Sequence, residues 1–405
     1  MLKSGLKSAI AIIAVFIICT CIDPYTPKLK GYDSNLVVDG LITDANSSYT
    51  VRLTKTMQNQ SDTPSAVSDA TVIIADDAGN SSSLINHGNG IYKTDSTNFH
   101  GMIRRIYVLH IVTSDGKEYE SEPCIMQSVQ DIDSIYYSKD QELVSNNSQS
   151  QEGLRIYLDS KEGDNNQFYR WSFEETWKFK VPYPKKWDFN PADSSITSVA
   201  DLKEYCWKNS KSSEILIYSN YSGHSGPVRK YPIFFIATDQ SDRLMIEYSI
   251  LVKQYSISQK EYNFWDNLTK VNTTGGDIFA SQPFPVNSNI HNINNLGEKV
   301  LGYFQVSAVK EKRIFIPFSE TVRLQLSFYN YPCERFERSA NTPPDHFTWA
   351  ELYTIWCITS TYYFIEPLYY SGTNTLEKMV FAKPECANCE LTGTLKKPDF
   401  WIDLK

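Results

Sequence analysis

Short runs of alternating apolar and polar residues, separated by turn signals, constrain the fold of this chain more than any other feature. In residues 49–54, every second side chain is apolar, which is the period of a half-buried strand. Residues 70–75 and 106–112 are rich in β-branched residues, and each run leads into a turn that contains Asp and Gly. About seven such strands within residues 34–128 predict an immunoglobulin-like β-sandwich.

The rest of the chain, residues 129–405, has the same character and predicts a larger β-rich domain that is sandwich or barrel-like. Aromatic residues make up 13% of the sequence, and Tyr and Phe favour strands. We therefore expect a mostly β protein. The strands that its runs predict include residues 154–158, 169–180, 244–255, 300–306 and 322–328.

One or two short helices interrupt this second region. Ser258 has the side chain of an N-cap, and Glu261 stands three residues later as its capping-box partner. Tyr262, Trp265 and Leu268 follow at helical spacing. A second helical stretch is predicted over residues 346–356.

The first twenty residues have the layout of an export signal. Lys3 and Lys7 precede an apolar run over residues 9–18, which is shorter than the about 20 residues of a spanning helix. Cys21 follows the run, as in bacterial lipoproteins, where such a cysteine carries the acyl chains. We therefore predict a signal peptide at 1–20, lipidation of Cys21 and a tether over 21–33; an uncleaved membrane anchor is the alternative.

Six further cysteines are compatible with disulfides, because an exported chain folds in an oxidising compartment. Cys386 and Cys389 form a CxxC pattern, for which a redox pair and half of a zinc site are alternatives. The pattern lacks a thioredoxin-like context, and no histidine or second cysteine pair stands near it. The candidate disulfide cysteines are Cys124, Cys206, Cys333, Cys357, Cys386 and Cys389.

Charge and motif content argue against several function classes. The formal net charge is −8 and falls to −10 once Lys3 and Lys7 leave with the signal, which disfavours nucleic-acid binding. The sequence has no HExxH, no GxSxG and no phosphate-binding glycine loop. Glu174 and Glu175 are a carboxylate pair, but adjacent strand residues point to opposite faces. We therefore expect no enzyme, no catalytic residues, no metal site and no cofactor.

A dense aromatic segment is the best candidate for ligand or partner contact. Tryptophan and tyrosine stack on sugar rings and are frequent hot spots in protein interfaces. Trp171 shares one strand face with Trp177, so a buried core stripe is the alternative for these two. The loop over residues 183–187 is the more exposed part. The candidate contacts for a glycan or peptide are Trp171, Trp177, Tyr183 and Trp187.

Taken in order, several of these segments resemble a known family. The chain looks like the Bacteroidota lipoprotein family catalogued as domain of unknown function 4249, over nearly its whole length. The resemblance implies an outer-membrane lipoprotein, often encoded beside a TonB-dependent, SusC-like transporter, and gives no catalytic residues. The segments that carry it are residues 37–44, 49–54, 244–258, 300–304, 386–389 and 397–401.

Two functions remain as expectations from the sequence. The first is a non-enzymatic accessory or substrate-capturing subunit of a TonB-dependent transporter, anchored in the outer membrane through lipid on Cys21. The alternative is a surface glycan-binding or adhesive module that uses the aromatic segment. An enzyme acting on a surface polymer would require two carboxylates that face each other across a cleft.

Overall fold

The protein is built mainly from β-sheets, as predicted: strands account for 47% of the structure and helices for 12%. The sheets are open, so of the two arrangements expected for the second region, the sandwich is the one seen. The computed structural model describes residues 34–57, 63–95, 99–143, 150–161, 168–220, 226–274, 286–340 and 346–404, with the backbone alone at 273 and 274.

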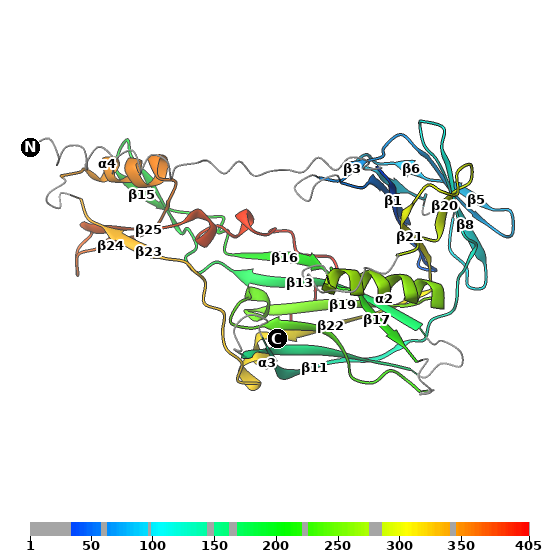
Figure 1. Cartoon of the computed structure of the whole chain (residues 1–405). Helices are drawn as coiled ribbons and strands as arrows, with labels where there is room; N and C mark the ends of the chain where they lie inside the picture. Colours follow the sequence, from blue (N-terminus) through cyan, green and yellow to red (C-terminus); the bar gives the residue numbers. More distant parts are fainter. Residues whose placement is uncertain are drawn as a thin grey trace, which may run out of the picture.

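A first sandwich packs two sheets around a shared apolar core (Figure 1). One sheet has the order β21(Leu301–Val306), β1(Leu36–Ile42), β2(Thr50–Lys55), β7(Ile91–Lys93), β6(Ile85–Asn86), with β3(Ser65–Ala66) on β2. The other has the order β20(Ile290–Asn292), β9(Glu118–Ser121), β8(Ile106–Val112), β4(Thr71–Asp76), β5(Ser81–Ser83), with β10(Cys124–Ile125) on β8. Alternation in β1 puts Leu36, Val38 and Ile42 in the core, since successive strand residues point to opposite faces.

Two strands of this sandwich come from far along the chain, which corrects the predicted division at residue 128. The sequence analysis placed residues 290–306 in the second domain, but β21 pairs in parallel with β1, and β20 pairs antiparallel with β9. Gly302 makes the close parallel pairing possible: its φ is +87°, and a Cβ there would lie 1.9 Å from the Val38 carbonyl oxygen. The chain therefore passes between the sandwiches three times.

The second sandwich lies in the middle of the molecule (Figure 1). One sheet has the order β11(Ile132–Leu143), β12(Ser150–Ser160), β18(Tyr231–Ala237). The other has the order β16(Tyr205–Lys211), β13(Phe168–Lys180), β19(Glu247–Ser256), β22(Val309–Pro317), with β17(Leu216–Ser219) also on β13. Aromatic rings join the two sheets: the Trp171 and Tyr231 ring centroids are 4.3 Å apart, and those of Phe173 and Phe234 are 4.8 Å apart.

A small distal lobe lies at the other end of the second sandwich from the first (Figure 1). It combines the hairpin β14(Trp187–Asn190)–β15(Ser195–Ser198) with the sheet β23(Arg335–Arg338), β25(Leu376–Ala382), β24(Tyr363–Tyr369). The lobe has two apolar clusters of its own, one around Phe364 and Phe381 and one around Val380 and Cys386. Apart from β20 and β21, residues 129–405 thus form the second sandwich and this lobe, where one domain was predicted.

Three α-helices occur in the described residues. α2(Gln259–Thr274) confirms the predicted Ser258 cap, since Ser258 Oγ accepts a hydrogen bond from the Glu261 backbone N–H at 3.1 Å. α4(Trp349–Tyr353) lies within the second predicted stretch and continues as a wider turn, η2(Thr354–Thr359).

The third helix, α3(Phe318–Arg323), overlaps the strand predicted over residues 322–328, so that prediction was wrong. Thr321 and Leu326 are buried at the end of the sandwich, and this tertiary packing outweighs the local alternation. The remaining helical elements are short 3-10 turns: η1(Asp242–Leu244), η3(Pro384–Cys386) and η4(Cys389–Leu391).

Candidate functional site

Two of the four predicted contact aromatics form part of a cleft in the distal lobe. The cleft has a volume of about 200 Å³. Tyr183 and Trp187, both partly exposed, provide aromatic walls, and Arg335 lies at the rim with its guanidinium Nη1 3.5 Å from the carboxylate of Glu366. An aromatic wall beside a polar rim suits a ligand with an apolar face and polar edges, such as a sugar ring.

The loop that carries these aromatics is held by the CxxC segment. The Tyr183 backbone N–H donates to the Cys386 carbonyl at 3.0 Å, and the Lys185 N–H donates to the Ala387 carbonyl at 3.1 Å. Lys185 also lies over the Tyr363 ring, with its Nζ 5.5 Å from the ring centroid. The loop is therefore positioned by a segment about 200 positions later in the sequence, and no local signal could have shown this.

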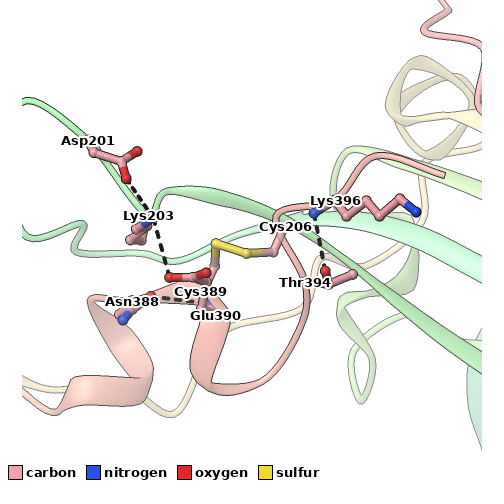
Figure 2. The surroundings of a disulfide bond; sticks show 8 residues. All are labelled: Asp201, Lys203, Cys206, Asn388, Cys389, Glu390, Thr394 and Lys396. Carbon is pink, nitrogen blue, oxygen red and sulfur yellow. Dashed lines mark hydrogen bonds and ion pairs between the residues drawn. A yellow bond between two sulfur atoms is a disulfide. The ribbon is translucent and has the colours of Figure 1, made fainter.

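Two disulfides hold the CxxC segment in place. Cys206 of β16 bonds to Cys389, and Cys333 bonds to Cys386, so each cysteine of the CxxC pattern has a distant partner. Figure 2 shows the first bond; beside it, Lys203 forms ion pairs with Asp201 and Glu390. The structural alternative for the CxxC pattern is confirmed over the redox and zinc alternatives.

The disulfide prediction was wrong for Cys124 and Cys357, which are free thiols. Cys124 lies in the first sandwich, where the structure describes no second cysteine. Cys357 lies in the distal lobe, where Cys333 and Cys386 are bonded to each other. Burial raises the pKa of Cys124 to about 12 and that of Cys357 to about 11. Both thiols are therefore protonated and weakly nucleophilic at neutral pH.

The other two predicted contacts, Trp171 and Trp177, belong to the core, and their assignment as ligand contacts was wrong. They are 1% and 6% exposed. Each indole N–H is satisfied internally at 2.9 Å, by Gln254 for Trp171 and by Asp242 for Trp177. Both residues lie on the face of β13 that packs against the second sheet, which is the core-stripe alternative.

The carboxylate pair of β13 divides between opposite faces, as expected. Glu175 is 2% exposed, accepts two hydrogen bonds from Arg243 at 2.7 and 3.2 Å, and accepts a third from the Tyr248 hydroxyl at 2.9 Å. Glu174 lies on the other face, 3.2 Å from Lys253. The two carboxyls cannot act on one substrate, and the fully bonded Glu175 has a structural role.

A second hollow, which the sequence did not indicate, lies where α2 meets the first sandwich. Its volume is about 330 Å³, and it is lined in part by β10 and β21. Glu261 lines it and is 3% exposed; burial, opposed in part by the charge of Arg170, raises the pKa of Glu261 to about 8. Only the Ser258 hydrogen bond of the predicted capping box is therefore present, because the Glu261 side chain accepts a hydrogen bond from the Trp265 indole N–H at 3.2 Å instead of one from the Ser258 backbone.

The predicted signal peptide, the Cys21 lipidation site and the tether at 21–33 lie outside the described residues and stay predictions. Within the described ranges, no helix is long and apolar enough to cross a membrane. In the same ranges, no three His, Cys, Asp or Glu side chains group as a metal site requires.

Comparison with known proteins identifies a family without a described activity. No protein with a curated description matches the chain. A family model described as a domain of unknown function matches residues 22–313, which includes most of both sandwiches. The match is shorter than the expected resemblance, since the CxxC segment and residues 397–401 lie beyond it. Because it covers more than half of the sequence, the chain belongs to the family of domain of unknown function 4249.

Proposed function

We propose that this protein is a non-enzymatic outer-membrane lipoprotein, anchored through Cys21, that captures a ligand for a TonB-dependent transporter. The observation that carries the proposal is the separation between the cleft and the predicted tether. The tether leads into the first sandwich at Ser34, whereas the cleft is in the distal lobe, beyond the second sandwich (Figure 1). A binding site in that lobe, with the second sandwich between it and Ser34, is accessible to a ligand and to a second membrane protein.

Purification of the tagged full-length chain from detergent-solubilised outer membrane tests this proposal. We expect a TonB-dependent transporter to co-purify, and a Cys21→Ser variant to lose both membrane partitioning and the transporter. Since the substitution alters only the anchor, the variant separates a membrane-dependent complex from adventitious binding. Recovery of the unaltered chain alone under mild detergent conditions would count against the proposal.

A second candidate function is a surface glycan-binding or adhesive module, which the half-exposed pair Tyr183 and Trp187 favours. Electrophoresis in gels that contain a polysaccharide measures this binding. We expect Trp187→Ala to abolish retardation, because the indole face is the largest stacking surface of the cleft, and Trp187→Phe to restore part of it. Tyr370→Ala is the control, since Tyr370 is 53% exposed in the same lobe but does not line the cleft.

Retardation that survives Trp187→Ala would place the glycan elsewhere on the protein. Absence of retardation of the unaltered protein on every polysaccharide would remove this second candidate. Because Trp187 also packs against the core of the lobe, the melting temperature of each variant is measured alongside.

A further inference from the structure

The hollow beside α2 has a composition that differs from that of the distal cleft. Its lining includes the apolar residues Ile125, Phe304 and Val306, and it includes Glu261, which is buried. A volume of about 330 Å³ is within the range of pockets that hold small ligands. The hollow therefore has a buried acidic residue and apolar side chains in the same lining.

The carboxyl group of Glu261 forms no ion pair with any residue that the structure describes, and the charge of Arg170 acts on it only from a distance. One oxygen accepts the Trp265 indole N–H at 3.2 Å, and that is its only side-chain hydrogen bond to a described residue. The nearest guanidinium, that of Arg170, is engaged elsewhere: its Nη1 donates to Gln305 at 2.7 Å, and its Cζ lies 4.4 Å from the centre of the Trp265 ring. A buried carboxyl group without an ion-pair partner stays protonated, because its ionisation would leave a buried charge that no opposite charge balances.

The other groups around the hollow select for a cation. Glu122, Cys124 and Tyr303 are acids in their ionisable forms, so an anionic ligand would find no positive partner among them. The one base in the lining, Lys260, forms an ion pair with Glu122 at 2.8 Å and is 76% exposed at the mouth. Lys260 is therefore not a counter-ion for the buried acid.

We propose that this hollow binds a primary amine on a short alkyl stem, with the Glu261 carboxylate as its counter-ion. The ammonium group donates hydrogen bonds to the carboxylate, and the stem lies along Ile125 and Val306. The bound amine keeps its three N–H protons, and the Glu261 carboxyl proton passes to solvent. One proton is thus released for each amine bound near neutral pH. The site is independent of the proposed transporter role, because it lies in another part of the molecule and needs no partner.

Calorimetric titration of the full mature chain with n-butylamine tests this site, with butan-1-ol as the neutral probe of equal size. We expect butylamine to bind at least about tenfold more tightly, since one charge-assisted hydrogen bond contributes that much. Titration in two buffers of different ionisation enthalpy measures the proton release, which we expect to be near one per amine.

Glu261→Gln is the decisive variant, because glutamine keeps the acceptor for Trp265 and removes the charge. It is expected to lose the preference for butylamine and the proton release. Glu118→Gln, at an exposed position of β9, is the matched control and should bind as the unaltered chain does. No detectable butylamine binding, equal binding of the alcohol, no proton release, or unchanged binding by Glu261→Gln would each overturn the proposal.

Discussion

Replacement of Glu261 by glutamine is expected to stabilise the protein at neutral pH. The folded protein holds this carboxyl with a pKa of about 8, while an unfolded chain has an ordinary glutamate pKa of about 4.3. Between these values the folded state binds one proton more than the unfolded state, so the stability due to this group falls as the pH rises. Glutamine does not ionise, so the variant does not lose this stability as the pH rises.

The size of the effect follows from that pKa difference. Each pH unit between the two pKa values costs about 1.4 kcal/mol, so the penalty at pH 7, which lies about 2.7 units above the unfolded value, is about 4 kcal/mol. The variant should therefore gain relative to the unaltered chain by about 1.4 kcal/mol per pH unit from pH 5 to pH 7, and the gain should level off above pH 8. Loss of packing is small, because the two side chains have nearly the same shape.

Urea unfolding at pH 5, 6, 7 and 8, followed by tryptophan fluorescence, measures this difference. The control is Glu118→Gln, the same substitution at an exposed position of β9. The reasoning is refuted if the difference between Glu261→Gln and the unaltered chain is the same at all four pH values. That outcome would mean that the folded protein ionises Glu261 as easily as the unfolded chain does.

Three further variants test the structure. Replacing Cys333 and Cys386 together by alanine should destabilise the distal lobe by about 4 kcal/mol, because their bond closes a chain of 53 residues; calorimetry measures it, and an unchanged transition would contradict the pairing. Gly302→Ala should cost at least about 2 kcal/mol in urea unfolding, since β21 cannot keep its pairing with a side chain there; a neutral effect would exclude the positive φ. Glu175→Ala should lower the free energy of unfolding by about 3–5 kcal/mol, because it leaves Arg243 without its ion-pair partner. A loss below about 1 kcal/mol, as for an exposed ion pair, would contradict the buried ion pair.

The fold was predictable where its signals are local. Alternation marked β2, runs of β-branched residues before a turn marked β4 and β8, and Ser258 marked the start of α2, because each pattern depends on residues only a few positions apart. The parallel pairing of β21 with β1 was not predictable in this way. It joins residues more than 260 positions apart, and strand pairing depends on the packing of whole sheets.

The candidate sites were also predictable only in their local features. The sequence indicated that an aromatic segment is present, but only the packing of β13 against β18 decided that Trp171 is core. Only the assembly of the distal lobe decided that Trp187 lines a cleft. The even set of cysteines indicated disulfides, yet their pairing depended on where the CxxC segment docks. Burial raised the pKa of Glu261, and burial is a property of neighbours brought from elsewhere in the chain.

By itself the sequence therefore determined the mostly β character, the positions of many strands and of two helices, and the export signal as a prediction. Those features follow from the period, capping and charge of neighbouring residues. The tertiary structure alone decided the return of β20 and β21, the separate distal lobe, the disulfide partners, and which polar and aromatic groups face a cavity. These depend on contacts between distant residues, which no local pattern encodes.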